Sequence, residues 1–292
     1  MKVKTIISAL FAFILLASSC GVVPITGRRQ LSLVPDQEVL ALSAQQYNSF
    51  IRSAPLANNT AQGARVARVS KNIAAATQAY LKSNGYESMI NQLAWEFNLV
   101  NSPQVNAFCM PGGKIVVYTG ILSVCSSDDQ LAAVIAHEVS HAIAKHSSER
   151  LSNEMVRQLG GNLLTQTVGG NSTVMKQVIG QVYGIGSQVL VSLPYNRKQE
   201  YEADKMGMVF MAMAGYNPEA AIQLWQRMAQ QGQNKLEFLS THPSDANRVK
   251  ALQEYLPEAL KYYKNNGNTK RSNQNSKTTG NNKGGFRLKS TR

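Results

Sequence analysis

Residues 127–146 read SDDQLAAVIAHEVSHAIAKH, and this stretch decides the fold of the 292-residue chain. It predicts a helix, because Ser127 can cap the first turn and Gln130 stands at the third helical position of a capping box. The apolar residues that follow recur at helical spacing: Leu131, Val134, Ile135 and Ala142. We expect this helix to continue to about Leu151.

The same stretch contains His137-Glu138-Val139-Ser140-His141, the pattern H-E-x-x-H. Residues four apart share one face of a helix, so the two imidazoles can bind one Zn²⁺ ion at about 2.0–2.1 Å. The adjacent Glu138 can then reach a water molecule rather than the metal, as a general base in metal-assisted hydrolysis does. The alternative is a solvated helix that carries two histidines and an ion-paired glutamate.

A second cluster of acidic residues follows in Glu200-Tyr201-Glu202-Ala203-Asp204. Glu200 and Asp204 lie four apart, so their carboxylates share a helix face. One of them can complete a three-ligand catalytic zinc site, and the other can fix the tautomer of a ligand imidazole. Taken alone, such a cluster is more often a charged surface. We expect Glu202, on the other side of the helix, to face solvent.

The rest of the chain places strands early and helices later, which predicts an α+β fold. Helices are expected over residues 35–51, 60–82 and 197–214, the last with Asn196 as its cap and Gln199 completing a capping box. Another helix should begin at Asn217-Pro218 and end at Gly232. Strands are expected over residues 93–99 and 114–119, with a turn at 111–113 before the second. Residues 160–186 hold seven glycines and are interpreted as a broken helix or a mobile flap.

The two ends of the chain look different from its body. Residues 1–19 have a basic start, an apolar segment too short to span a bilayer comfortably, and small residues before Cys20, which is typical of a secretory leader. The order L-A-S-S-C resembles a bacterial lipobox, so Cys20 is expected to become the lipid-modified N-terminus. An ordinary cleaved leader is the alternative. Residues 264–292 are expected to form a basic, disordered tail, which leaves 20–263 as one domain.

Composition excludes several classes of protein. The chain has 43% hydrophobic residues and three cysteines, so it is neither disordered as a whole nor a disulfide-dense scaffold. The net charge of +13 is mainly a property of the end of the chain, because residues 261–292 carry nine Lys and Arg and no Asp or Glu. Cys109 and Cys125 would meet an oxidising compartment, where they either pair or stay free.

H-E-x-x-H followed by E-x-x-A-D resembles peptidase family M48. These gluzincins include CAAX prenyl endopeptidases, the mitochondrial Oma-type protease and bacterial periplasmic quality-control proteases. The resemblance covers about residues 21–263. It also includes Asn106-Ala107-Phe108 with the Pro-Gly-Gly strand after it, and Thr241-His242-Pro243 with Arg248 beyond.

The resemblance implies a mainly helical zincin domain with a small sheet whose edge strand borders the active-site cleft. It implies one Zn²⁺ per chain held by His137, His141 and Glu200. The catalytic positions that match the family are the base Glu138, the supporting acid Asp204, and His242 with Arg248 near the catalytic centre.

The roles of three of these residues stay open. In similar periplasmic members, the histidine that corresponds to His242 can be a fourth zinc ligand that keeps the enzyme latent. His242 could instead donate to the oxyanion or be a structural histidine before a proline. Arg248 could pair with Glu200, bind the oxyanion or lie on the surface. His146, five residues beyond His141, does not share its helix face and is expected to be a surface or helix-end histidine.

The expected function is that of a zinc metalloendopeptidase of the bacterial cell envelope. It would be lipid-anchored through Cys20, would face the periplasm from the outer membrane, and would degrade unfolded or misassembled envelope proteins. Residues 114–119 are the candidate edge to which an extended substrate adds as a strand.

Two other functions stay open. One is a catalytically silent envelope lipoprotein that binds or chaperones proteins, and the intact Glu138 argues against it. The other is a polyanion binder that works through the basic tail. We expect no nucleic-acid partner, because a secreted protein meets lipid headgroups and glycans first. Sequence does not give the oligomeric state.

Overall fold

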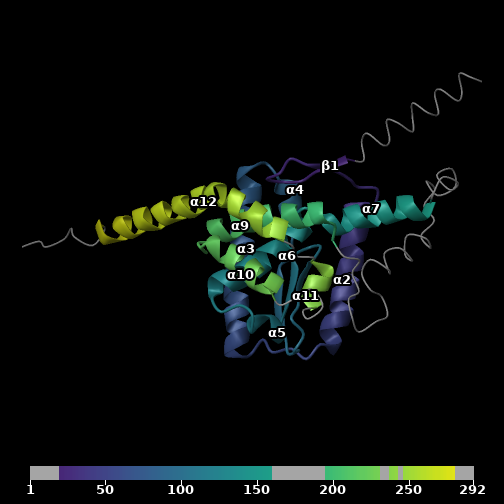
Figure 1. The fold of residues 1–292 in the computed structure, drawn as a ribbon, viewed down its shortest axis with the longest axis horizontal. Coiled ribbons are helices and arrows are strands. Elements are labelled where there is room, and N and C mark those ends of the chain that lie inside the picture. The colour runs from purple at the N-terminus through teal and green to yellow at the C-terminus, as the bar shows by residue number, and fades with distance from the viewer. Residues whose placement is uncertain (1–19, 160–194, 231–236, 243–245, 280–292) are drawn as a thin grey trace, which may run out of the picture.

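The computed structural model describes residues 20–159, 195–230, 237–242 and 246–279. Within them the chain forms a central layer of helices beside a small sheet (Figure 1). The strands are β1 (Cys20–Val22), β2 (Arg29–Leu31), β3 (Glu96–Val100), β4 (Ala107–Met110) and β5 (Lys114–Tyr118). The helices before the H-E-x-x-H motif are α2 (Asp36–Ser53), α3 (Ala61–Ser83), α4 (Glu87–Ile90) and α5 (Thr119–Leu122). The later ones are α6 (Asp128–Ile143), α7 (His146–Leu159), α9 (Arg197–Met213), α10 (Glu219–Gln230), α11 (Glu237–Thr241) and α12 (Ala246–Thr279).

The predicted α+β class is confirmed: helices predominate, and the main sheet has three strands. Its order is β3-β5-β4, with β3 parallel and β4 antiparallel to β5. The turn predicted at 111–113 joins β4 to β5, and Gly112 and Gly113 take φ values of 88° and 83°, which other residues rarely adopt. β1 and β2 pair separately as an antiparallel hairpin.

Residues 114–119 are not an edge, so that prediction is wrong. β5 is the central strand, and β3 and β4 are the edges. The chain leaves β3, passes to the far side of the sheet as β4, and turns back into the middle as β5. Four of the five β5 residues are buried, which is typical of a strand covered on both faces. The edge strand that packs against α6 is β4.

Helix α6 is the centre of the core. Every residue from Gln130 to His141 is buried. The sequence pattern predicts only one buried apolar face for this helix, whereas the structure buries the helix on all sides. Sheet strand β4 and helices α3, α9 and α10 pack around α6. A helix that carries polar catalytic side chains is thereby held inside the molecule, where each polar group needs a partner.

The predicted helix to Leu151 is broken. α6 ends at Ile143, Lys145 takes a left-handed φ of 54°, and α7 starts at His146. The predicted cap at Ser127 is present, because its side chain accepts a hydrogen bond from Gln130 N. The Gln130 side chain instead accepts from Ser126 N, one residue before the cap, so the capping box is not closed.

The capping box at the start of α9 is confirmed, because Asn196 and Gln199 exchange side-chain hydrogen bonds with each other's backbone. Helix α12 extends to Thr279 and projects from the body (Figure 1). The segment expected to be a basic, disordered tail, residues 264–292, begins within this helix. The leader, the glycine-rich segment 160–186, Gly232 and residues 280–292 lie outside the described residues.

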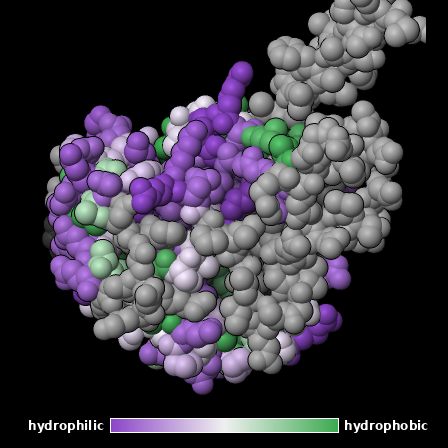
Figure 2. All heavy atoms as spheres, turned by 45° about the vertical axis from the view of Figure 1, so that its right-hand side comes forward, coloured by the Kyte–Doolittle hydropathy of each residue, from purple (hydrophilic) through white to green (hydrophobic). Residues whose placement is uncertain are grey.

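Among the described residues on the face in Figure 2, hydrophilic side chains predominate, and hydrophobic ones form small groups. Among the described helices, none has the length and apolar composition that crossing a membrane requires.

Cys109 and Cys125 are both buried and free, so they do not form the disulfide left open above. Burial raises the pKa of Cys125 to about 12, which keeps it an unreactive thiol.

Candidate metal centre

Packing of α9 on α6 brings the two sequence clusters together. His137 and His141 come from α6 and Glu200 from α9, and all three are buried. His242, directly after α11, joins them, and the four residues can offer ligand atoms that all lie within 4.8 Å of one another. The described residues contain no other group of this kind.

The spacing of these atoms fits a tetrahedral metal ion. Nε2 of His137 lies 3.1 Å from Nε2 of His141 and 3.3 Å from Nδ1 of His242. Glu200 oxygens lie 3.4 Å from each of the Nε2 atoms and 3.1 Å from Nδ1 of His242. Metal–ligand bonds of about 2.0–2.1 Å at tetrahedral angles place ligand atoms about 3.3–3.4 Å apart. The donor set and its geometry therefore fit a small divalent cation.

His242 is aimed into this cluster from a separate part of the chain. Its backbone N donates to Phe238 O at 2.9 Å, and its ring stacks on Phe238 with centroids 4.5 Å apart. While Nδ1 faces the ligand atoms, Nε2 lies 3.4 Å from Oε1 of Glu138. This is the place of a fourth ligand, and it is not the place of a structural histidine remote from the site.

Glu138 points to the same centre but does not share the ligand cluster. It is 2% exposed, and burial raises its pKa above the ordinary value of a glutamate. A carboxylate with a raised pKa holds a proton more readily, which is what a general base that later returns the proton requires.

Asp204 and Arg248 pair with two of the candidate ligand residues, His137 and Glu200. Oδ1 of Asp204 lies 3.0 Å from Nδ1 of His137. Arg248, 1% exposed, donates to both Asp204 oxygens at 2.8 Å and lies 2.7 Å from Oε2 of Glu200. Of the alternatives for Arg248, the structure shows pairing with Glu200, and the surface position is excluded. The guanidinium also lies 4.4 Å from the ring of Trp225.

The surroundings shift the pKa values of the candidate ligand residues in different directions. Burial would raise the pKa of Glu200, but Arg248 and His242 lower it well below its ordinary value. Burial disfavours the charged form of His137, yet Asp204 and Glu200 raise its pKa to about 9. Burial lowers the pKa of His141 well below its ordinary value. In the metal-free site His137 therefore holds a proton more readily than His141, and that proton would have to leave before His137 could bind a metal ion.

One sequence prediction at this site is wrong and another holds only in part. His146 is expected at the surface or at a helix end; it is the first residue of α7 but is 0% exposed. Glu202 is expected in solvent but is 5% exposed, with its carboxylate held by Thr26, Arg28 and His146. Helical spacing does not report the tertiary features that bury these two residues. These features are the helix break at Lys145 and the packing of the β1–β2 segment on α9.

Sequence reasoning also missed Tyr195. Its ring lies against the His141 ring with centroids 3.8 Å apart and a tilt of 30°, and the Arg150 guanidinium lies 3.8 Å from the centre of the Tyr195 ring. Tyr195 stands just before the capped start of α9, but no spacing pattern marks it.

The comparisons with known proteins agree with this geometry. The model of peptidase family M48 matches residues 62–256. The chain is 33% identical to the mitochondrial metalloendopeptidase OMA1 of Saccharomyces cerevisiae over 63% of this chain and 54% of that protein. It is 32% identical to the human metalloendopeptidase OMA1 over 82% of this chain and 46% of that protein. It is also 29% identical to the beta-barrel assembly-enhancing protease of Yersinia pestis, over 53% of this chain and 33% of that protein.

The chain thus spans about half the length of the metalloendopeptidases it resembles, and less of the assembly-enhancing protease. The family match covers most of the chain and includes the helices that carry the H-E-x-x-H motif and its glutamate partner. On these grounds the chain belongs to peptidase family M48.

Proposed function

We propose that this protein is a zinc-dependent metalloendopeptidase that cleaves unfolded or misassembled proteins of the bacterial cell envelope. One observation carries the proposal: four buried ligand groups gather with their ligand atoms within 4.8 Å of one another, and Glu138 lies beside them, 3.4 Å from Nε2 of His242, without being one of them. A purely structural metal clip does not need that extra carboxylate.

Zinc is the metal that this donor set favours. Three imidazoles and one carboxylate in tetrahedral arrangement match its preferences, whereas Mg²⁺ and Ca²⁺ favour more oxygen ligands in larger shells. Membership of family M48 points the same way.

The chemistry divides between the metal and the chain. A bound zinc ion supplies the positive charge that acidifies a water molecule and polarises the scissile carbonyl. Glu138 takes one proton from the attacking water at a carboxylate oxygen and later gives it to the leaving amine nitrogen. The C–N bond breaks, and the water oxygen stays on the new carboxyl group. Asp204 and Arg248 hold His137 and Glu200 in place while this happens.

His242 gives the site a closed form. With Nδ1 among the ligand atoms and Nε2 toward Glu138, its ring takes the place where water and substrate would meet the base. The arrangement favours a latent enzyme that opens when the His242 ring moves away from the other ligand groups. Phe238 fixes the ring by stacking, so the closed form is held from outside the ligand set.

Substrate would pair with β4 rather than with β5. β4 is an edge of the described sheet and packs against α6. Pairing through main-chain hydrogen bonds reads the backbone more than the side chains. It therefore suits extended, unfolded segments of many sequences.

Placement in the envelope rests on two supports. Residues 1–20 have the order of a lipoprotein leader, and the similar proteins from Yersinia pestis and Escherichia coli are named beta-barrel assembly-enhancing proteases. Lipid chains on Cys20 would anchor the protein at the outer membrane. Each methylene buried in the membrane contributes about 0.8 kcal/mol to this anchoring. Other relatives are named mitochondrial.

The proposal is tested by cleavage of unfolded casein by purified protein spanning residues 21–292. Wild type and His242→Ala are each compared with the same protein carrying Glu138→Gln, at equal bound zinc. We expect cleavage in at least one background and a loss of about 10²-fold or more with Glu138→Gln. If neither background cleaves although zinc is bound, the silent binding protein becomes the better function.

A further inference from the structure

A buried chain of hydrogen-bonding groups leads away from the metal centre at His141. Nδ1 of His146 lies 2.8 Å from Nδ1 of His141, and Nε2 of His146 lies 2.9 Å from Oε2 of Glu202. His146 is 0% exposed. A metal ligand is thus followed by a second imidazole and then by a carboxylate.

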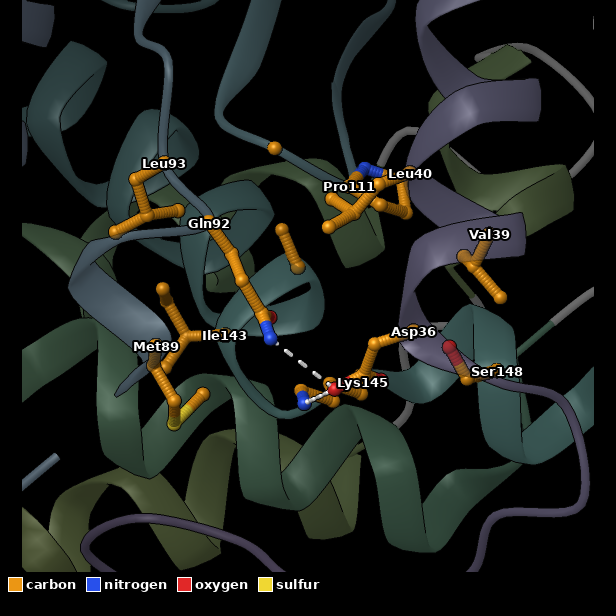
Figure 3. Close-up of a pocket in the computed structure, with 12 residues that line it drawn as sticks. Asp36, Val39, Leu40, Met89, Gln92, Leu93, Pro111, Ile143, Lys145 and Ser148 are labelled. Atoms are coloured by element: carbon orange, nitrogen blue, oxygen red, sulfur yellow. Dashed lines mark hydrogen bonds and ion pairs between the residues drawn. The ribbon is translucent and has the colours of Figure 1, made fainter. Parts of the chain in front are cut away.

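The turn at Lys145 produces this contact. On a continuous helix, a residue five positions on lies about 140° around the axis from His141 and points elsewhere. Here α6 ends at Ile143 and Lys145 takes a left-handed φ of 54°, and this break in the helix brings His146 to the ring of His141. Figure 3 shows the Lys145 side chain paired with Asp36, the first residue of α2, to which Gln92 also donates at 3.3 Å. A residue other than glycine is strained at such a φ, and this ion pair holds it there.

The direction of each hydrogen bond follows from the metal site. Nε2 of His141 belongs to the ligand cluster, so the proton of that neutral ring is on Nδ1. Nδ1 of His146 must then accept, which leaves the His146 proton on Nε2, and that proton is donated to Glu202. Each group has one role, and the chain ends on a carboxylate, as carboxylate–histidine–metal arrangements do. Here one further imidazole stands between the ligand and its carboxylate.

The carboxylate is fixed by the segment between β1 and β2. Arg28 Nε donates to Oε2 of Glu202 at 2.7 Å, and the Thr26 hydroxyl donates to Oε1. The Arg28 guanidinium also donates to Glu149 of α7 at 2.9 Å. Three separate elements therefore meet at this point: the N-terminal hairpin, α7 and α9.

We propose that His146 is a positioning residue for the metal ligand His141, held by Glu202 and through it by Arg28 of the N-terminal hairpin. This inference rests on the proposed function, because it requires a metal at His141. An ordinary buried histidine satisfied by Glu202 would need no contact with the ligand. The 2.8 Å contact to the free nitrogen of His141 is the feature that such a histidine would lack.

Two substitutions of His146 distinguish its contact with His141 from its contact with Glu202. His146→Asn keeps an acceptor near the position of Nδ1, facing His141, and loses the link to Glu202. His146→Gln keeps a polar group near the position of Nε2, facing Glu202, and leaves the His141 N–H without an acceptor. Both remove the ring and are uncharged, so their effects on packing are comparable. The readout is the zinc dissociation constant, measured by competition with a chromogenic chelator.

We expect His146→Gln and His146→Ala to weaken zinc binding about 10–100-fold. His146→Asn should stay within about threefold of the wild type. Ser152→Ala is the control, because Ser152 is buried in α7 and accepts a hydrogen bond from Leu33 N without touching the site. It should change thermal stability but not zinc affinity.

The outcomes are distinct. Equal zinc affinity of the Asn and Gln variants, or wild-type affinity of His146→Gln, overturns the positioning role. If His146→Ala does not fold, the Asn–Gln comparison still decides. A wild-type protein that binds no zinc would instead overturn the proposed function.

Discussion

Gly207 of α9 lies against the backbone of His137 in α6. A Cβ at Gly207 would stand 3.1 Å from His137 N and 3.3 Å from His137 Cα. Gly207 is seven residues beyond Glu200 and three beyond Asp204, so it lies on the same side of α9 as both. The missing side chain therefore sets how closely the carboxylates approach the imidazole that they serve.

Gly207→Ala should weaken the metal site. Alanine favours a helix by about 1 kcal/mol over glycine, but here two helix backbones must separate, which costs about 1–3 kcal/mol. We expect a small net loss in the free energy of unfolding and a clear loss of zinc affinity, both larger for Gly207→Val. Chemical denaturation and chelator competition measure the two effects.

Lys205→Ala, at an exposed position of the same helix, is the matched control and should leave zinc affinity unchanged. A Gly207→Ala protein that is more stable than the wild type and binds zinc as tightly would contradict this prediction. It would show that α6 and α9 can accommodate a methyl group at Gly207 without moving apart.

Arg248→Met should destabilise the protein by about 3–5 kcal/mol, because it leaves the buried carboxylates of Glu200 and Asp204 without their cation. Bound zinc offsets part of the charge, so the loss should be greater in metal-free protein. Urea unfolding with and without zinc measures it. Arg68→Met removes a half-exposed pair with Asp128 and should cost less than about 1 kcal/mol. Similar losses for the two variants would contradict the role given to Arg248.

His242→Ala should separate zinc binding from hydrolysis. Loss of one of four ligand groups should raise the zinc dissociation constant at least about tenfold, which calorimetry can measure. Casein hydrolysis at saturating zinc should rise about tenfold if only about a tenth of wild-type molecules are open. A fall in hydrolysis under those conditions would mean that His242 assists the reaction as an oxyanion donor.

Much of the metal centre could be predicted from sequence because its residues lie at helical spacing. His137 with His141, and Glu200 with Asp204, are pairs four apart, and spacing alone places each pair on one helix face. His242 and Arg248 came only from the family resemblance. Nothing in their spacing shows that α11 and α12 return to the site.

His146, Glu202 and β5 show where sequence reasoning stops. The position of His146 depends on one backbone angle at Lys145, and that of Glu202 on Arg28, which is 174 residues away in the chain. The central place of β5 depends on strand order, which alternation of side chains does not encode. In none of the three cases does the spacing of side chains along the sequence carry this information.

Glu149→Gln should lower stability in a pH-dependent way. Burial would raise the pKa of Glu149, but hydrogen bonds from Arg28 and Gln199 outweigh it and hold that pKa below its ordinary value. A carboxylate with a depressed pKa stabilises the fold above its unfolded-state pKa of about 4.3, and this contribution is lost as the pH falls through the folded-state value. We expect the variant to be about 2 kcal/mol less stable than the wild type at pH 7.

Urea unfolding between pH 7 and pH 3 measures the difference between the two proteins. It should stay nearly constant down to about pH 5 and shrink below about pH 4.3, because the wild-type carboxylate then takes up a proton and resembles glutamine. Glu254→Gln, at a well-exposed position of α12, should differ from the wild type by less than about 0.5 kcal/mol throughout. A Glu149→Gln difference that does not change with pH would mean that shape, and not the charge facing Arg28, holds α7 to the N-terminal hairpin.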